Sequence, residues 1–292
     1  MFSQDLLYIV FLGTSIIAGC IVRSSRGDAK RFACLILGLS SAIIICGFEV
    51  WHAFILVGGF VIFNSLVAFR FIHFAVFLWG FSYLIFFHTA HFYGFSKPSP
   101  LTQMLHLFLT LKIVGVSFEL HDTWAIINKI KSNNANNISD NSSNLRLKYK
   151  GIMTTSYDVV CYAFCYIGML TGPYYTYRTF DDMLRGWPTK APRLSSGPFL
   201  RRLQDVPFFA FLYLVGAYFI DFDVLHDPAF HEENLLYRLA YIAAIFFVYR
   251  MRLYFAWVMG ECVCMSVGLG AYPAISRPVV GDGPTDLVAL DR

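Results

Sequence analysis

Two ionisable residues interrupt an apolar stretch and are the first candidates for chemistry. Lys112 and Glu119 stand seven residues apart inside the run Leu101–Leu120. Seven residues make nearly two helical turns, so both side chains are expected on one face of a helix. Ionisable groups inside a membrane span are costly and usually face a cavity or a partner. We therefore predict that this pair lines a cavity; an internal salt bridge, or Glu119 at the membrane interface, is the alternative.

A basic segment, residues 172–205, is the second candidate, and it begins at a helix break. Pro173 lacks a backbone N–H and Gly172 relaxes the backbone, so a helix is interrupted there. Behind the break, Tyr177 and Arg178 are predicted to face a cavity, because an arginine that faces lipid is costly. A guanidinium in that place suits phosphate groups. Anchoring of the segment to anionic lipid is the alternative.

The residues that follow indicate two short helices. Thr179 resembles a helix cap, with Asp181 and Asp182 in the first turn. The run Phe199–Leu203 mixes apolar and cationic side chains, which is typical of a helix at the membrane interface. A structural ion pair between Arg178 and Asp181 or Asp182 is the alternative to phosphate binding.

The histidine and cysteine spacings do not indicate a metal site. His88 and His91 could share an ion, but no nearby Cys, Asp or Glu completes a ligand set. Cys262 and Cys264 lack the two-residue spacing of a zinc knuckle and lie in an apolar run, so we assign them to the core. The acidic connection 226–233 is typical of a luminal loop. We expect no metal ion and no resident cofactor.

The composition shows which elements must position these residues. Hydrophobic residues make up 57% of the 292 residues and charged residues 14%, against about 45–50% and about 25% in soluble proteins. A soluble domain this apolar would expose large apolar patches. With 23 basic and 19 acidic residues, the net charge of +4 is too small to indicate nucleic acid as a partner. We predict an all-α, polytopic transmembrane helical bundle.

About nine apolar segments approach the roughly 20 residues that a membrane span needs. Several are short enough to be tilted, kinked or incompletely spanning. The segments are Leu6–Val22, Phe32–Phe48, Ala53–Phe69, Ile72–Phe87, Leu101–Leu120, Tyr157–Thr171, Val206–Ile220, Leu235–Tyr249 and Leu253–Leu269.

Basic residues of the first half cluster in every second connection between these segments. One crossing per segment puts the three clusters on one side of the membrane, which the positive-inside rule assigns to the cytosol. The N-terminus is then luminal, and the connection 122–156, with its polar loop 128–150, is cytosolic. We therefore expect the glycosylation sequons at Asn137 and Asn141 to be unused. The clusters are Arg23, Arg26, Lys30 and Arg31; Arg70; and Lys129, Lys131, Arg146, Lys148 and Lys150.

The second half does not follow this simple count. A full crossing by Tyr157–Thr171 would place the six basic residues of 174–205 in the lumen, against the rule. We therefore predict a re-entrant element that breaks at Thr171-Gly172-Pro173 and returns to the cytosol. Irregular backbone at membrane depth is tolerated only inside protein or along a wet cavity. A full crossing, with a further short segment restoring parity, is the alternative.

Two stretches carry a resemblance to a known family. The run Cys165–Phe180 is similar to the Gly-Pro…Tyr-Arg-Thr signature of the membrane-bound O-acyltransferases. The runs Tyr249–Trp257, Gly260–Cys264 and Gly268–Pro273 closely resemble the lysophosphatidylinositol acyltransferase branch of that family. Leu109–Ile113 and Glu119 also fit that branch.

The resemblance implies a multi-helix horseshoe around a tunnel in the endoplasmic reticulum membrane. Acyl-CoA, as substrate, would enter from the cytosol, and the lysophospholipid from the membrane or the luminal side. Arg250 and Arg252 join the substrate-binding candidates on the same basis. A His acting as general base and an Asn serve the acyl transfer in the family.

The family's Asn and His lie beyond the Gly-Ala-Tyr-Pro region, and this chain ends at Arg292. No Trp-His-Gly motif occurs: the pair Trp51-His52 stands in the wrong region and continues into Ala53. We therefore assign no catalytic residue, and we expect residues 1–280 to form a partial acyltransferase domain followed by a polar tail, 281–292. The chain is then a fragment or a short isoform.

Three functions stay open at this point. The first is an acyltransferase that transfers an acyl group from acyl-CoA to a lysophospholipid, lysophosphatidylinositol by resemblance, in the remodelling of phospholipid chains. The second is an inactive short form that forms oligomers with the full-length enzyme or competes with it. The third is an unrelated transporter or channel, against which the uneven spans and the lack of repeats argue.

Overall fold

A computed structural model describes residues 2–25, 27–94, 97–135, 149, 151–186, 196–279, 281 and 283–287. Regular structure in these residues is helical, and the one pairing of extended backbone among them is an isolated bridge between Val279 and Gly283. The predicted all-α class is therefore confirmed.

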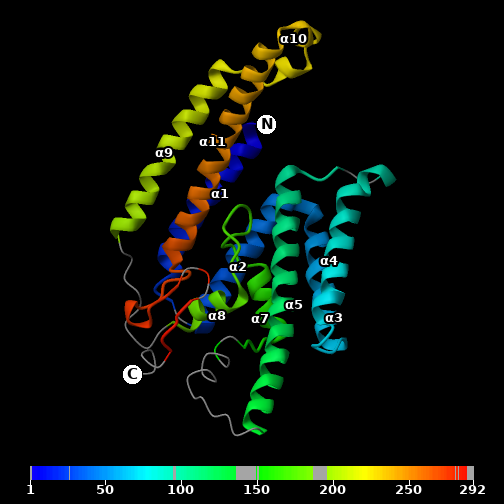
Figure 1. The fold of residues 1–292 in the computed structure, drawn as a ribbon, viewed down its shortest axis with the longest axis vertical. Helices are drawn as coiled ribbons and strands as arrows, with labels where there is room; N and C mark the ends of the chain where they lie inside the picture. Colours follow the sequence, from blue (N-terminus) through cyan, green and yellow to red (C-terminus); the bar gives the residue numbers. More distant parts are fainter. Residues whose placement is uncertain are drawn as a thin grey trace.

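The first half of the chain runs up and down as five helices (Figure 1). A 3-10 turn at Gly47–Glu49 reverses the chain after α2, and a second one, Ala90–Tyr93, follows α4. The ends of α1, α3 and α5, from which the basic connections start, therefore lie toward one end of the molecule (Figure 1), as predicted. The five helices are α1 (Phe2–Val22), α2 (Gly27–Cys46), α3 (Val50–Leu66), α4 (Ile72–Thr89) and α5 (Pro100–Ala135).

The predicted segment Tyr157–Thr171 is not a spanning helix. Only α7 (Ser156–Ala163) is helical, and its eight residues rise about 12 Å, far less than the roughly 30 Å of a hydrocarbon core. Residues 164–176 form a buried loop that leaves α7 and returns to α8 (Tyr177–Arg185) at the same end (Figure 1). The predicted position of the break is wrong, because the helix ends at Ala163 and not at Thr171-Gly172-Pro173. The predicted return is present, and the irregular backbone lies inside protein as expected.

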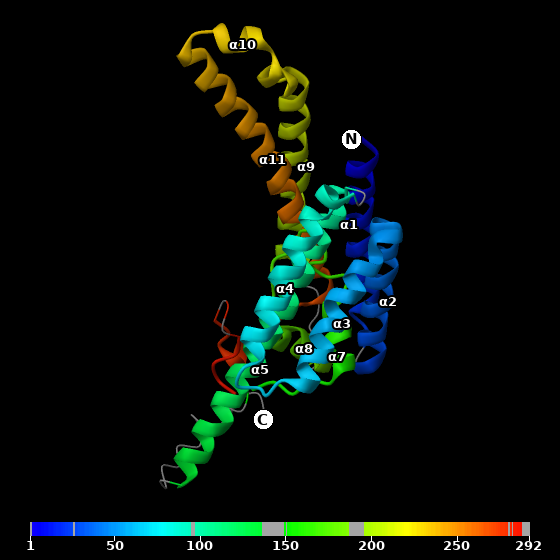
Figure 2. The same ribbon diagram turned by 90° about the vertical axis from the view of Figure 1, so that its right-hand side faces the viewer.

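The second half forms a long helical hairpin that lies against α1 (Figures 1 and 2). Its arms are α9 (Ser196–Phe219) and α11 (Leu235–Val267), joined by a 3-10 turn at Asp223–His226 and by α10 (Pro228–Glu232). The acidic connection therefore lies at the end opposite the basic clusters. Arg202 ties the arms together through Glu261, with 2.5 Å between Nε and Oε2.

Two of the predicted boundaries in this hairpin are wrong. Leu235–Tyr249 and Leu253–Leu269 were expected as separate segments, but α11 runs through Arg250 and Arg252 without a break. Those charges interrupt the apolar pattern, but arginine is a good helix former and the backbone continues. The expected interfacial helix Phe199–Leu203 is likewise the first part of α9.

Four helical runs in the described residues are long and apolar enough to cross a membrane. They are Gly27–Leu66, which joins α2 and α3, Ile72–Tyr93, Pro100–Ser132 and Leu235–Val267, and Leu6–Val22 is a shorter apolar helix. The chain is a multi-pass membrane protein, and the predicted number of nine segments is not reproduced.

Candidate functional site

Lys112 holds the buried loop from the side of α5. Its side chain is only 4% exposed. The Lys112 ammonium donates to the carbonyl oxygens of Tyr162, Cys165 and Ile167 at 3.3, 3.2 and 3.2 Å. The rings of Tyr162 and Tyr175 lie 5.5 and 5.2 Å from the same nitrogen. The buried positive charge of Lys112 is thus compensated by three backbone oxygens and two aromatic faces.

Glu119 holds the other end of the loop, where α8 begins. Its carboxylate accepts hydrogen bonds from the backbone N–H groups of Tyr177 at 2.8 Å and Arg178 at 3.0 Å. These are the first two amides of α8, which have no partner within the helix, and a negative charge is favourable at a helix N-terminus. The cap residue of α8 is Thr176, whose side chain accepts from the amide of Thr179. The predicted cap at Thr179 is therefore wrong by three residues.

Lys112 and Glu119 reach the same loop from one helix, as their spacing predicts, but they form no salt bridge with each other. Neither lines the two cavities described below. Their contacts are with backbone atoms of the loop and of α8. This outcome was not among the alternatives that the sequence suggested, because carbonyl positions cannot be read from residue types.

Glycines let two helices approach the buried loop closely and let the loop fold against itself. A Cβ on Gly38 of α2 would lie 1.6 Å from the carbonyl oxygen of Phe164. A Cβ on Gly260 of α11 would lie 2.9 Å from the oxygen of Thr171. Within the loop, a Cβ on Gly172 would lie 2.3 Å from the Cα of Gly168. The predicted break at Gly172 is therefore a close turn pressed against α11, while Pro173 beside it is exposed.

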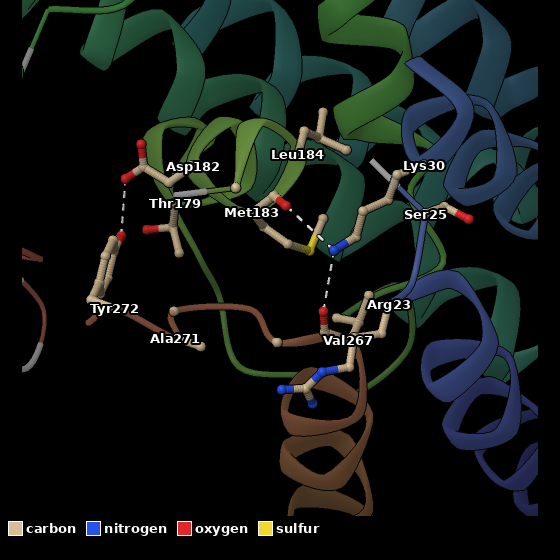
Figure 3. Close-up of a pocket in the computed structure, with 13 residues that line it drawn as sticks. Arg23, Ser25, Lys30, Thr179, Asp182, Met183, Leu184, Val267, Ala271 and Tyr272 are labelled. Atoms are coloured by element: carbon tan, nitrogen blue, oxygen red, sulfur yellow. Dashed lines mark hydrogen bonds between the residues drawn. The ribbon is translucent and has the colours of Figure 1, made fainter. Parts of the chain in front are cut away.

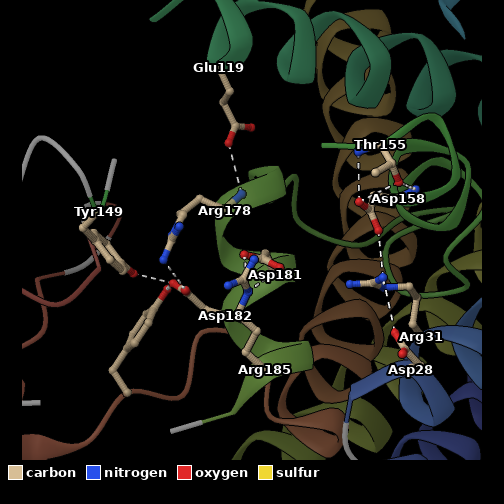
Figure 4. A network of polar contacts seen from close by, with 11 residues as sticks. Asp28, Arg31, Glu119, Tyr149, Thr155, Asp158, Arg178, Asp181, Asp182 and Arg185 are labelled. Carbon is tan, nitrogen blue, oxygen red and sulfur yellow. Dashed lines mark hydrogen bonds and ion pairs between the residues drawn. The ribbon is translucent and has the colours of Figure 1, made fainter. Parts of the chain in front are cut away.

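Arg178 belongs to a polar network at the basic end (Figure 4). Its guanidinium lies 3.1 Å from Asp182, one turn further along α8, and stacks 4.0 Å from the centre of the Tyr149 ring. The Asp182 carboxylate also accepts from the hydroxyls of Tyr149 and Tyr272. Burial raises the pKa of Asp182, and Arg178 and the two hydroxyls partly offset that rise. The ion pair that the sequence offered as an alternative is thus present.

Tyr177 is buried beside Tyr162 and Phe180. Neither Tyr177 nor Arg178 is among the residues that line the two cavities. The structure therefore brings together the predicted residues of α5, the loop and α8 as one connected unit. Their role in substrate binding stays a prediction.

A basic crevice of about 40 Å³ opens between α2, α8 and the end of α11 (Figure 3). Lys30 lines this crevice, and its ammonium donates to the carbonyl oxygens of Met183 and Val267, both at 3.3 Å. Arg23 donates to the carbonyl oxygen of Met265 at 3.4 Å. These oxygens belong to the last turns of α8 and α11, where cations are favourable. The sequence analysis used Arg23 and Lys30 only to assign the membrane orientation, and it did not predict their hydrogen bonds to these carbonyl oxygens.

A larger, apolar cavity of about 370 Å³ lies between α1, α5, α9 and α11. Arg252 is the one cation among the described residues of its wall, and Thr171 of the buried loop also lines it. The Thr171 hydroxyl is hydrogen-bonded to the hydroxyl of Tyr8 from α1. The lining residues are Tyr8, Ile9, Pro100, Leu101, Met104, Thr171, Ala210, Tyr213, Leu214, Tyr249, Arg252, Leu253, Phe255 and Ala256.

Of the substrate-binding residues predicted from the sequence, Arg252 alone lines this apolar cavity. Arg250 is exposed and donates to the hydroxyl of Tyr254 at 2.9 Å. No pattern in the sequence marks Tyr8, because a tyrosine near the start of an apolar helix is ordinary. In the part of the chain that the structure describes, no group of three metal-ligating side chains occurs. Cys262 and Cys264 are buried and free, as assigned.

No family model matches the chain, but curated proteins match it along its whole length. The membrane-bound acylglycerophosphatidylinositol O-acyltransferase of Xenopus laevis is 31% identical over 294 residues, which cover 100% of this chain and 60% of that protein. The protein of the same name from Homo sapiens is 31% identical over 98% of this chain and 59% of its own length. The protein of the same name from Drosophila melanogaster is 33% identical over 97% of this chain and 59% of its own length. The chain spans about three fifths of the length of these relatives.

Proposed function

Because this chain is related over its whole length to the N-terminal part of the membrane-bound acylglycerophosphatidylinositol O-acyltransferases, we propose that it contributes the acceptor-binding part of such an enzyme. The reaction would join a hydroxyl oxygen of a lysophospholipid to the acyl carbon of acyl-CoA and release the CoA thiol. We propose lysophosphatidylinositol as the acceptor and the endoplasmic reticulum membrane as the location.

The apolar cavity is the observation that carries this proposal. A lysophospholipid has one acyl chain, a phosphate and a free hydroxyl. The cavity offers an aliphatic and aromatic wall with one guanidinium, that of Arg252, and its volume falls in the range of about 300–1,000 Å³ that is usual for ligand sites. The acyl chain would lie along the apolar wall, and the phosphate would bind Arg252 through charge-assisted hydrogen bonds.

The buried loop would act by shaping this cavity. Thr171 lines the cavity wall, and the loop that carries it is held by Lys112 at one end and by Glu119 at the other. We propose that these two residues position the wall and touch no substrate. Arg178 would stabilise the same unit from α8 through its ion pair with Asp182.

We propose that the basic end faces the cytosol and that the N-terminus is luminal. The end of the molecule toward which α1, α3 and α5 run (Figure 1) is the end that the positive-inside rule places in the cytosol. Acyl-CoA carries several phosphates and would approach from that end. Residues from the starts of α1 and α5 line the apolar cavity, so the acceptor would enter from the membrane or the luminal side.

A binding measurement tests the proposal. The purified chain in detergent is titrated with lysophosphatidylinositol and, separately, with a monoacylglycerol that lacks the phosphate. We expect Arg252→Gln to weaken binding of the lysophospholipid on the order of 10-fold or more, because a charge-assisted hydrogen bond contributes about 1.5–3 kcal/mol. Arg252→Lys should restore it in part.

Arg201→Gln is the matched control, because Arg201 is an exposed arginine of α9 outside the cavity. Its affinity for lysophosphatidylinositol should equal that of the unchanged chain. Equal affinities in Arg252→Gln and in the control, or equal losses for both lipids, would contradict the assignment of the phosphate to Arg252.

A further inference from the structure

Two buried thiols from distant parts of the chain lie against each other. Cys34 of α2 and Cys165 of the buried loop are each 0% exposed, and both are free cysteines. Their side chains are in hydrogen-bonding contact. The backbones are close here as well, because Gly38, one turn after Cys34, packs directly on the carbonyl oxygen of Phe164, the residue before Cys165. Sulfur atoms in contact meet the first geometric requirement of a disulfide.

Two buried lysines flank this thiol pair. The Lys112 ammonium donates to the carbonyl oxygen of Cys165 at 3.2 Å and interacts electrostatically with its thiol. Lys30, one turn before Cys34 on α2, interacts in the same way with both thiols. A cation beside a thiol favours the thiolate, which is the form that reacts with oxidants. The pair therefore combines a sulfur in a cationic environment with a second sulfur in contact with it.

The basic crevice gives a small oxidant a route toward the pair. Lys30 lines this crevice (Figure 3), and the same side chain interacts with both thiols. The crevice volume of about 40 Å³ exceeds the roughly 10–15 Å³ that one water molecule needs. Hydrogen peroxide is little larger than water and fits this space, whereas a bulky thiol reagent such as N-ethylmaleimide does not.

We propose that Cys34 and Cys165 form a site of reversible oxidation by hydrogen peroxide. The Cys165 thiolate attacks one oxygen of the peroxide, the O–O bond breaks, and a sulfenic acid and hydroxide form. The hydroxide takes up the proton that the Cys165 thiol lost and becomes water. The Cys34 sulfur then attacks the sulfenic sulfur, so that the S–S bond forms and the S–O bond breaks, and the Cys34 proton leaves with the hydroxide as a second water. The sulfur pair is oxidised, the peroxide is reduced, and a dithiol reductant reverses the change.

The disulfide would tie the buried loop to α2. This loop contributes Thr171 to the wall of the apolar cavity, and Lys112 and Glu119 hold it by hydrogen bonds. Oxidation adds a covalent link to the same segment. The thermal midpoint of the oxidised chain should therefore rise, because a link between residues far apart in the chain restricts the unfolded state. The proposal does not depend on the proposed acyl transfer.

Disulfide mapping tests this site. The purified chain in detergent is treated with hydrogen peroxide, the remaining thiols are blocked with N-ethylmaleimide under denaturing conditions, and unreduced peptides are identified by mass spectrometry. We expect peptides joined through Cys34 and Cys165 as the predominant cysteine pair, and dithiothreitol should separate them. In Cys34→Ser, dimedone, which reacts with sulfenic acids, should label Cys165. Cys161→Ser and Cys264→Ser, which remove other buried thiols, should keep the joined pair.

The exposed cysteine supplies the control for access. N-ethylmaleimide added to the folded chain should label Cys20, which is exposed, and should leave Cys34 and Cys165 unlabelled. Peroxide treatment that oxidises Cys20 but joins no Cys34 to Cys165 would overturn the proposal. Equal amounts of pairs that contain Cys161 or Cys264 would overturn it as well, because the contact between the two thiols would then not select the partner.

Discussion

Replacing Lys112 by methionine should destabilise the protein strongly. The ammonium makes three hydrogen bonds to backbone oxygens of the buried loop and its neighbour Tyr162. Charge-assisted bonds contribute about 1.5–3 kcal/mol each, but methionine also removes the burial cost of the charge, which is several kcal/mol. The three buried oxygens that lose their donor cost about 1–3 kcal/mol each, which leaves a net loss of about 3–5 kcal/mol once the relieved burial cost is subtracted.

A thermal unfolding scan in detergent measures this loss. For a chain of this size, about 3–5 kcal/mol corresponds to a fall of the midpoint on the order of 10 °C. Lys129→Met is the control, because Lys129 is exposed near the end of α5, and its midpoint should not move. A midpoint in Lys112→Met equal to that of the control would refute the claim that the ammonium holds the loop.

Three further predictions follow from the loop, the network at α8 and the topology. Gly38→Ala should abolish recovery of monodisperse protein in size-exclusion chromatography, because its Cβ would lie 1.6 Å from a loop carbonyl oxygen, whereas Gly13→Ala, with open space around it, should be recovered normally. Burial raises the pKa of Asp182 above its unfolded value, so the folded state binds this proton more tightly, and stability should fall as the pH rises from the ordinary aspartate pKa through the raised one. Asp182→Asn should flatten that decline in a series of thermal midpoints. Endoglycosidase should cause no shift in gel mobility, because the sequons at Asn137 and Asn141, which lie outside the described residues, are placed in a cytosolic loop.

The sequence predicted the parts of the site that depend on local rules. A seven-residue spacing put Lys112 and Glu119 on one face of a helix, and the structure confirms that both reach the same loop. The Gly172-Pro173 pair predicted irregular backbone, which is present there, but the helix break was placed too late because α7 already ends at Ala163. Counting the apolar segments was enough to predict that the basic connections lie toward one end of the molecule, and this prediction needed no knowledge of packing.

What the sequence could not show depends on contacts between distant residues. The partners of Lys112 are carbonyl oxygens, which every residue has, so no pattern of residue types marks them. The hydrogen bond between Tyr8 and Thr171 joins positions 163 residues apart, and the apolar cavity exists only once four helices are placed. The continuity of α11 was missed because hydropathy registers the charges of Arg250 and Arg252, while the backbone of a helix is insensitive to them.

The central claim is that the apolar cavity binds a lysophospholipid, and photocrosslinking tests it most directly. Lysophosphatidylinositol with a photoreactive group at the end of its acyl chain is bound to the purified chain, and labelled residues are mapped by mass spectrometry. We predict labels on cavity residues such as Met104 and Ala210, which excess unlabelled lysophosphatidylinositol removes. Labels confined to outward residues such as Phe211 and Tyr218, which are 63% and 83% exposed, and insensitive to the competitor would contradict the claim.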